Sequence, residues 1–377
     1  MNSAECTSHH LLAGSATSLS AVPDGSVHLI VTSPPYPMIA MWDEVFSAQD
    51  PAIGVALAAG DGGGAFARMH GVLDAAWVEC VRVLRPGGIL CVNVGDAVRT
   101  IGESFRRYPN HARISQTLDD LGLQALPLIL WRKSTNAPTK FMGSGMLPVG
   151  AYVTLEHEYV LVFRRGGLRR FTSEERVARR QSAFFWEERN HWFSDVWELQ
   201  GTRQNRDVSP ATALIVADSA AAADRDRTGA FPLELAYRLI CMFSIGGDTV
   251  LDPFAGTGTT TLAAIAAGRH SVGVEREAQL VAEAAERAIA SADLLNRRVR
   301  NRLTGHRAFL RAREEAGKPA PRYHNNPHDV PVVTRQETEL ELREVHQITR
   351  TGPPDPAAPA ATLQATYRPL SRSSPEA

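Results

Sequence analysis

Two short stretches of the chain hold residues whose types and spacing suit a group-transfer reaction. The first is a turn of Ser33, Pro34, Pro35 and Tyr36 that directly follows the apolar run 27–32. Proline fixes its own φ and keeps the preceding residue extended, so the Ser33 hydroxyl and the Pro34 carbonyl are held as a pair of acceptors. Such a pair can accept the N–H bonds of a flat exocyclic amine, and the face of an aromatic ring stabilises positive charge that develops there. The turn therefore predicts chemistry on an amino group, although a plain loop or a polyproline motif has the same composition.

The second stretch is a glycine loop between two apolar runs. Asp252 closes the first run, Gly256 and Gly258 form the turn, and Glu275 closes the second run. Glycines let the backbone approach a ligand, the helix that begins at Thr259 points free N–H groups at it, and an acid about 20 residues beyond the turn suits ribose hydroxyls. We therefore expect an adenosyl ligand, with Asp252 facing a cationic group because an unpaired acid is costly to bury. A P-loop is disfavoured because the turn lacks Lys, whereas a dinucleotide site or a purely structural turn stays open.

Strands alternating with helices must position these two stretches. Short apolar runs rich in β-branched residues predict buried parallel strands, and apolar residues at helical spacing predict the helices between them. The expected strands cover residues 27–32, 88–94, 126–131, 158–163, 249–252 and 271–275, and the expected helices cover 73–84 and 259–267. This order predicts an open α/β sheet with both stretches at its carboxyl edge, where such folds bind ligands.

Composition narrows the class of protein. The chain has 377 residues, with 40 Lys and Arg against 41 Asp and Glu, a formal net charge of −1 and 44% hydrophobic residues. These values exclude a histone-like polycation and a disordered acidic chain, and they leave room for one large domain or two ordinary ones. We expect a soluble, cytoplasmic protein with no membrane segment. We expect no metal site, because the four cysteines are scattered: Cys6, Cys80, Cys91 and Cys241.

The two stretches, in this order, resemble the bacterial beta-class DNA amino-methyltransferases, which act on cytosine N4 or adenine N6. The resemblance lies in TSPPYP at 32–37 and LDPFAGTGTT at 251–260, supported by VLRPGGIL at 83–90 and HEYVLVFRR at 157–165. It implies a Rossmann-like methyltransferase fold with a seven-stranded sheet, a permuted motif order and a target-recognition insert. It also implies S-adenosylmethionine as the cofactor and a target base flipped out of double-stranded DNA.

Carried over residue by residue, the resemblance assigns roles at both stretches. The catalytic turn falls on Ser33, Pro34, Pro35 and Tyr36. The cofactor site falls on Asp252, Phe254, Gly256, Gly258, Thr259, Glu275, Phe231 and Ser15. Two departures are visible: Ser15 stands where many relatives have Asp, and the stretch Gly229-Ala230-Phe231-Pro232 lacks the Lys-His that relatives often have before the Pro.

The residue at position 33 separates the two reactions of the family. Ser33 is similar to the residue of enzymes that act on cytosine N4, whereas Asp is more usual among those that act on adenine N6. We therefore expect sequence-specific methylation of cytosine N4, with adenine N6 as the first alternative. Methylation at cytosine C5 needs a nucleophilic Cys in a Pro-Cys turn, which neither Cys80 nor Cys91 has. More distant alternatives are an RNA or protein amide methyltransferase and a DNA-binding module without activity.

The expected organisation places a DNA-reading insert within the sheet. We expect the catalytic half at 1–165, a target-recognition insert at 166–230 and the cofactor-binding half at 231–296. A basic extension is expected at 297–350, and a disordered tail at 351–377. Arginines interleaved with aromatic residues mark the insert, because basic side chains grip phosphates or read guanine. The expected DNA contacts are Arg169, Arg170, Arg176, Arg179, Arg180 and, from a basic loop, Lys133. Besides duplex DNA, a restriction endonuclease acting on the same site is a candidate partner.

Overall fold

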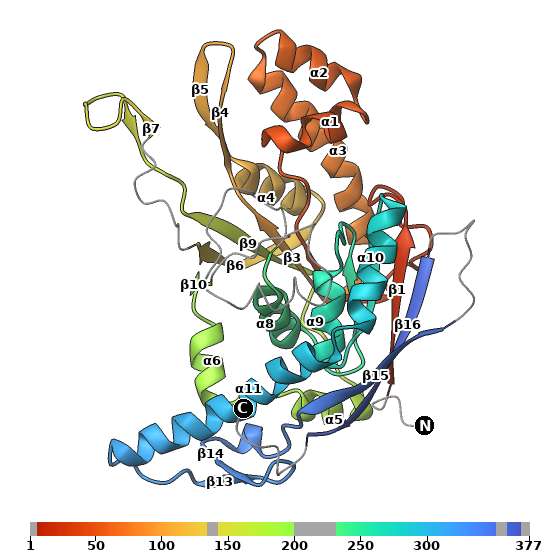
Figure 1. Cartoon of the computed structure of the whole chain (residues 1–377), viewed down its shortest axis with the longest axis vertical. Helices are drawn as coiled ribbons and strands as arrows, with labels where there is room; N and C mark the ends of the chain where they lie inside the picture. Colours follow the sequence, from red (N-terminus) through yellow and green to blue (C-terminus); the bar gives the residue numbers. More distant parts are fainter. Residues whose placement is uncertain (1–5, 134–141, 200–230, 352–359, 371–377) are drawn as a thin grey trace.

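A mixed sheet of ten strands runs through the described part of the protein (Figure 1), in the order β10-β6-β9-β3-β2-β11-β12-β1-β16-β15. The computed structural model describes residues 6–133, 142–199, 231–351 and 360–370. From edge to edge the strands are β10 (Val196–Glu198), β6 (Leu123–Arg132), β9 (His157–Arg165), β3 (Leu84–Val94), β2 (Val27–Thr32), β11 (Thr249–Asp252), β12 (His270–Glu275), β1 (Cys6–Ala13), β16 (Ala360–Pro369) and β15 (Arg343–Thr351). The stretch from β6 to β1 is the predicted seven-stranded sheet, in which β9 alone runs antiparallel to its neighbours.

The two chemical stretches meet because their strands are neighbours. The catalytic strand β2 and the cofactor strand β11 pair in parallel, with Leu29 opposite Val250 and Ile30 opposite Leu251. Both strands are apolar and buried, which is the pattern of parallel strands covered on both faces. The predicted permuted order is therefore confirmed, since the catalytic strand comes first along the chain and the two carboxyl ends lie side by side.

Helices cover both faces of the sheet and enclose two cores. One face carries α3 (Gly62–Val83) and α4 (Asn110–Asp120), which pack on the inner strands around Trp77 and Ile114. The other face carries α8 (Leu233–Phe243), α9 (Thr259–Ala267), α10 (Ala278–Ile289) and α11 (Ala292–Glu315). The predicted helix 259–267 has the observed bounds, and α3 begins before the predicted start at residue 73 because Asp61 caps it by accepting from the Gly64 amide.

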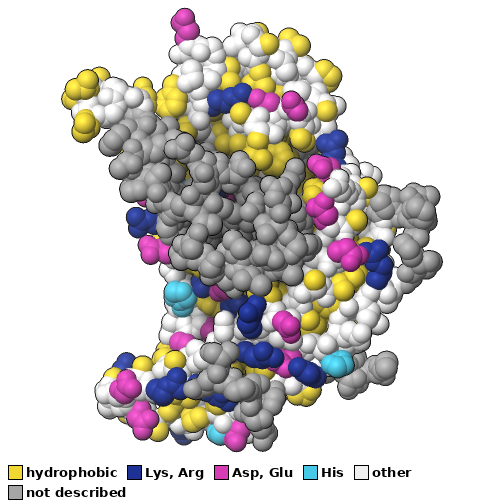
Figure 2. All heavy atoms as spheres, in the orientation of Figure 1, with side chains coloured by type: hydrophobic (Ala, Val, Ile, Leu, Met, Phe, Trp, Pro, Cys, Tyr) yellow, Lys and Arg dark blue, Asp and Glu magenta, His cyan; other side chains and the backbone are white. Residues whose placement is uncertain are grey.

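Short helices and two hairpins surround the carboxyl edge (Figure 1, upper part). They are η1 (Ala40–Trp42), α1 (Asp43–Ser47), α2 (Pro51–Ala58), the hairpin β4 (Ala97–Ile101) with β5 (Ser104–Tyr108), and the hairpin β7 (Met142–Gly143) with β8 (Ala151–Tyr152). The rings of Phe105 and Tyr152 stack at 4.7 Å and join the two hairpins. Hydrophobic side chains gather at the tip of the β7–β8 hairpin (Figure 2), where Met146 and Val149 are 86% and 98% exposed.

The C-terminal segment forms part of the sheet, which corrects the expectation of a disordered tail from residue 351. Strand β16 pairs antiparallel with β1 and with β15, and its Ala361, Leu363 and Ala365 are buried. The expected basic extension 297–350 likewise contributes α11, β13 (Tyr323–Asn325), β14 (Val330–Val332), η2 (Arg335–Glu337) and β15. Residues of α11, β13 and β14, with Phe185 at the start of α6 (Trp186–Trp192), form a third, smaller core, and α5 (Ser173–Gln181) is joined to this region by a hydrogen bond from the Glu341 amide to the Gln181 carbonyl at 3.0 Å. Residues 200–230 of the expected insert, and 352–359 and 371–377 of the expected tail, lie outside the described residues.

Candidate active site

The catalytic turn leaves the carboxyl end of β2. Thr32, the last residue of the strand, is buried, and Ser33 Oγ lies 3.0 Å from the Tyr36 hydroxyl oxygen. Met38, just after the turn, has a φ of 67°, in the left-handed region that bulky residues rarely adopt. Strain of this kind persists only where the surroundings over-determine the backbone. The turn is therefore held in one conformation with Ser33 beside Tyr36.

A cluster of polar side chains surrounds the Tyr36 hydroxyl. Tyr36 donates to Glu158 Oε2 at 2.9 Å, and Asn93 Nδ2 donates to the Tyr36 oxygen at 2.8 Å and to Glu158 Oε2 at 2.7 Å. The Lys133 ammonium pairs with Oε1 of the same carboxylate. A Cβ on Gly95 would stand 3.2 Å from both Glu158 Cγ and Tyr36 Cε2, so glycine allows this close approach. Burial, together with the Glu158 charge, raises the pKa of Tyr36 well above its usual value, and the hydroxyl keeps its proton at neutral pH.

Asn110, the first residue of α4, ties the catalytic turn to the end of β3. Its amide nitrogen donates to the carbonyl oxygens of Pro37 at 3.1 Å and Gly95 at 2.9 Å, and its Oδ1 lies 3.0 Å from His70 Nε2. Because Oδ1 can only accept, His70 carries its proton on Nε2. Burial lowers the pKa of His70 to about 4, which keeps the ring neutral in its role as a donor. These buried hydrogen bonds fix how the turn sits over the sheet edge.

The glycine loop lies beside this turn, between β11 and α9. Gly256 and Gly258 have φ values of 50° and 80°, and Gly258 caps the N-terminus of α9. Glu275 Oε2 accepts from the Gly256 amide at 2.9 Å. Nothing lies within 4 Å of the position that a Gly256 Cβ would take, and the helix that begins at Thr259 presents free N–H groups at the loop. The loop thus keeps the space, donors and acid that an adenosyl ligand requires.

Asp252 links the catalytic turn to the glycine loop. It is 3% exposed, and its carboxylate accepts from Thr32 Oγ1 at 2.6 Å, Thr260 Oγ1 at 2.6 Å and the Phe254 amide at 3.1 Å. Burial raises the pKa of Asp252 to about 6 in spite of these donors. In the structure Asp252 therefore links the end of β2 to the start of α9, while its expected contact with a cationic ligand stays a prediction.

Three further residues assigned to the cofactor border the same edge. Phe254 is half-buried, and its ring meets that of Trp77 edge-on with centroids 6.2 Å apart. Phe231, 6% exposed, precedes α8, and α8 leads back to the start of β11, so its first turn lies at the carboxyl edge. Ser15 follows β1 at this edge and lies 2.8 Å from Thr17 Oγ1. All the residues assigned to the cofactor therefore come from one edge of the sheet.

Arg169, by contrast, is a structural residue, and the expectation that it contacts DNA is wrong. Its guanidinium bonds both carboxylate oxygens of Asp248, at 2.6 and 2.9 Å, and Glu175 at 2.8 Å. Asp248 immediately precedes β11, at the amino edge of the sheet. The side chains of Arg169 and Asp248 are 12% and 4% exposed, which leaves the pair no room to grip a phosphate.

The other expected DNA contacts do not gather at the catalytic edge either. Because β9 runs antiparallel, its last residue, Arg165, lies at the amino edge, and α5 follows there (Figure 1). Arg170, Arg176, Arg179 and Arg180 are exposed in this part of the chain. Arg180 pairs with Glu339 at 2.8 Å, and the Arg179 guanidinium lies 4.6 Å from the centre of the Phe171 ring. Of the expected contacts, Lys133 alone lies at the catalytic edge, where Glu158 holds it.

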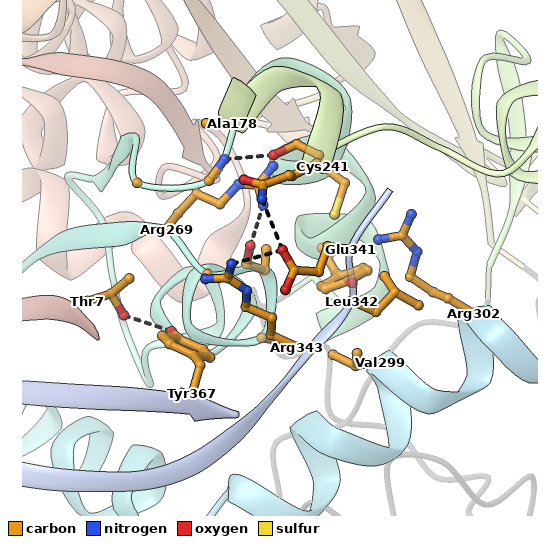
Figure 3. Close-up of a pocket in the computed structure, with 18 residues that line it drawn as sticks. Thr7, Ala178, Cys241, Arg269, Val299, Arg302, Glu341, Leu342, Arg343 and Tyr367 are labelled. Atoms are coloured by element: carbon orange, nitrogen blue, oxygen red, sulfur yellow. Dashed lines mark hydrogen bonds and ion pairs between the residues drawn. The ribbon is translucent and has the colours of Figure 1, made fainter. Parts of the chain in front are cut away.

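A cavity of about 150 Å³ opens at the amino edge (Figure 3), where the C-terminal strands close on the sheet. Thr7 and Tyr367 are joined there at 2.7 Å, and Glu341 accepts from Arg343 at 2.9 Å and from Gln181 at 3.1 Å. None of the residues assigned to catalysis or to the cofactor lines this cavity. Its polar groups bond to one another, as expected of a junction between elements.

Three residues of the site were not anticipated from the sequence: Glu158, Asn93 and Asn110. Glu158 and Asn93 stand in runs that are otherwise apolar, and Asn110 follows a proline. A polar residue inside a buried run is a signal in itself, because it must find a partner. What that partner is depends on which strands become neighbours, and β3 and β9 are paired only in the folded sheet.

Two kinds of feature are absent from the described residues. Within the ranges that the structure covers, no helix is long and apolar enough to cross a membrane. In the same ranges, no group of three or more His, Cys, Asp or Glu side chains is arranged to hold a metal ion.

Comparisons with known proteins match both halves of the sheet. Residues 27–286 match the DNA methylase family of N6/N4 methyltransferases. The chain is 46% identical over 339 residues to the Type II methyltransferase M.MthZI of Methanothermobacter thermautotrophicus, covering 89% of this chain and 90% of that protein. It is 44% identical over 285 residues to the Type II methyltransferase M.MjaI of Methanocaldococcus jannaschii, covering 73% of this chain and 89% of the relative. A protein of Thermus thermophilus described as a putative DNA modification methylase, solved with S-adenosyl-L-methionine, has a TM-score of 0.52 and 34% identity, covering 74% of this chain and 93% of that one.

Proposed function

This chain belongs to the DNA methylase family of N6/N4 amino-methyltransferases, and on that premise we propose that it methylates the exocyclic N4 of cytosine at a specific sequence in duplex DNA. Membership of the family makes it a DNA methyltransferase that uses S-adenosylmethionine. Ser33 supports cytosine as the target, because a Ser at this position resembles the enzymes that act on N4. One observation carries the proposal: Thr32, next to Ser33, donates to Asp252 at 2.6 Å and so joins the amine-binding turn to the cofactor loop.

The chemistry of the target explains what the turn must do. The exocyclic amine of cytosine is a poor nucleophile because its lone pair is delocalised into the ring. Ser33 Oγ and the Pro34 carbonyl accept its two N–H bonds, which favours the pyramidal nitrogen that can attack. The face of the Tyr36 ring then stabilises the positive charge that develops on the nitrogen. Since the turn is held by Asn110 and strained at Met38, these groups need no reorganisation during the reaction.

The glycine loop and its neighbours fit the cofactor. Gly256 and Gly258 let the backbone approach it, the first turn of α9 offers N–H donors, and we assign Glu275, which closes β12 beside the loop, to the ribose hydroxyls. Phe254, within the loop, and Phe231, just before α8, are the aromatic residues that the resemblance assigns to the adenosyl group. When bound, S-adenosylmethionine supplies an electrophilic methyl group on a sulfonium centre. Asp252 fixes the loop against the end of β2.

The duplex substrate sets two further parts of the proposal. A base inside the DNA double helix is out of reach of any active site, so the target cytosine must be flipped out of the stack.

The relatives named Type II methyltransferases support a cognate restriction endonuclease as the partner. Enzyme and endonuclease would form a modification system that acts on the same DNA sequence in the cytoplasm.

Product analysis tests this function directly. The purified protein is incubated with genomic DNA and S-adenosylmethionine that carries tritium on the methyl group, and the DNA is then digested to nucleosides and separated by chromatography. We expect the label in N4-methylcytosine. Label in N6-methyladenine would favour the other reaction of the family, and label in 5-methylcytosine or in no base would reject the assignment of the turn. Ser33→Ala should lower turnover far more than cofactor affinity.

A further inference from the structure

The hydrogen bonds around Tyr36 run in one direction, because the hydroxyl has only one proton to give. Glu158, as a carboxylate, can only accept, and so it accepts a hydrogen bond from the Tyr36 hydroxyl at 2.9 Å. Asn93 must present its Nδ2 to the same carboxylate, at 2.7 Å, and that amide also donates to the Tyr36 oxygen at 2.8 Å. The Tyr36 hydroxyl therefore donates its one hydrogen bond to Glu158 and can only accept hydrogen bonds from its other neighbours.

This direction decides what Ser33 offers to its substrate. Ser33 Oγ lies 3.0 Å from the Tyr36 oxygen, and either atom could donate if the pair stood alone. Since the Tyr36 hydroxyl donates to Glu158, the Ser33 hydroxyl must be the donor in the hydrogen bond between Ser33 and Tyr36. Its proton is then turned towards Tyr36, and both lone pairs of Ser33 Oγ are free to face an amine.

We propose that Glu158 is a positioning residue that makes Ser33 an acceptor, by holding the proton of Tyr36 away from it. The inference rests on the proposed function in one respect, namely that Ser33 accepts from the target amine. Asn93 and Lys133 support this role of Glu158. The Asn93 amide and the Lys133 ammonium both donate to the Glu158 carboxylate, so that the carboxylate acts only as an acceptor.

A serine at position 33 needs a neighbour that orients its hydroxyl proton, whereas an aspartate at that position would not. A carboxylate accepts in every orientation, whereas a hydroxyl carries a proton that can point at the amine and block it. If Gln replaces Glu158, its amide can donate to the Tyr36 oxygen. The Tyr36 proton is then released towards Ser33, and the Ser33 proton is turned towards the substrate.

Single-turnover methylation by the full-length protein tests this arrangement. Saturating DNA and labelled S-adenosylmethionine are mixed with Glu158→Gln, and Glu156→Gln serves as the control, because Glu156 lies just before β9 and is 42% exposed. We expect Glu158→Gln to slow methyl transfer by on the order of 100-fold, comparable to removing one preorganised donor from an active site. Its affinity for S-adenosylmethionine and its melting temperature should stay close to those of Glu156→Gln.

A double-mutant cycle separates this effect from a purely structural one. Tyr36→Phe keeps the ring and removes the hydroxyl through which Glu158 acts. In that background, Glu158→Gln should change the rate by less than about threefold. An equal loss in both backgrounds, or a wild-type rate for Glu158→Gln alone, would overturn the inference. The assay counts all methyl groups transferred to DNA, whichever base receives them. A product other than N4-methylcytosine would therefore refute the proposed function, while the ratio of the rates with and without Glu158→Gln would still test the role of Glu158.

Discussion

Replacing Arg169 with Ala should destabilise the fold and leave DNA binding by the folded protein unchanged. Sequence composition places this arginine in a DNA-reading segment, whereas the structure places it in a buried ion pair with Asp248 at the opposite edge of the sheet. The two interpretations predict different outcomes for one substitution. Arg170, the exposed next residue, is the matched control.

The size of the effect follows from the burial of the pair. Removing Arg169 takes two hydrogen bonds of 2.6 and 2.9 Å from an Asp248 carboxylate that is 4% exposed. The donors left near that carboxylate are the Ile245 amide at 2.9 Å and His28, 3.3 Å away, whose pKa is lowered by burial. Breaking a buried pair by removing one partner costs about 3–5 kcal/mol. We expect Arg169→Ala to lose about 3 kcal/mol of unfolding free energy, and Arg170→Ala to lose less than about 0.5 kcal/mol.

Urea unfolding and DNA binding, measured on the same preparations, provide the assay. Unfolding gives the loss of stability, and fluorescence anisotropy with a labelled duplex at low temperature gives the affinity of the folded variants. The dissociation constant should agree with that of the wild type within about twofold, since the Arg169 guanidinium is buried against Asp248 and Glu175 and cannot reach a phosphate. A variant as stable as the wild type that bound DNA tenfold more weakly would refute the reasoning.

Other predictions concern the glycine loop, the hydrogen bonds of Asn110 and the dependence of stability on pH. Because burial raises the pKa of Asp252 to about 6, the native state binds this proton more tightly than the unfolded chain, and the wild type should lose roughly 3 kcal/mol of stability as pH rises from about 4 to about 6. Unfolding curves of Asp252→Asn should lack this slope, and an identical slope in both proteins would contradict the assignment. Asn110→Ala strips the partners from three buried groups, so it should cost on the order of 3 kcal/mol and lower turnover more than cofactor affinity, as calorimetry and rate assays would reveal. Gly258→Ala puts a methyl group 3.0 Å from a side-chain carbon of α10 at a φ of 80°, and it should weaken S-adenosylmethionine binding by calorimetry. Gly305→Ala, in open space on α11, should leave that affinity unchanged.

Local patterns were enough to predict the elements that carry the two motifs. Strands 27–32 and 249–252 and helix 259–267 have the predicted bounds, because each is an apolar run ended by a proline, a glycine or an acid. Their place at one edge follows from the rule that parallel strands of an α/β fold end together. The place of the candidate residues on these elements could therefore be predicted from the sequence, while their roles stay predictions.

The parts that failed depend on contacts between distant segments. The strand β16 follows a proline-rich stretch of the sequence. Its alternating residues Ala361, Leu363 and Ala365 form a strand because β16 pairs with β1 on one side and with β15 on the other. Arg169 lies in a basic stretch like its neighbours, and only the folded sheet brings it to Asp248, 79 residues away in the chain. Glu158 gains its role from the neighbouring strand β3, which no local pattern reveals.

The methylated base made in a living host tests the central claim most directly. Host DNA is sequenced by a method that separates N4-methylcytosine from N6-methyladenine, after expression of the wild type or of Ser33→Ala. The turn of Ser33 and Tyr36 beside the glycine loop predicts N4-methylcytosine at one recurring sequence with the wild type and at none with the variant. Methylation of adenine, or methylation that persists in Ser33→Ala, would contradict the account.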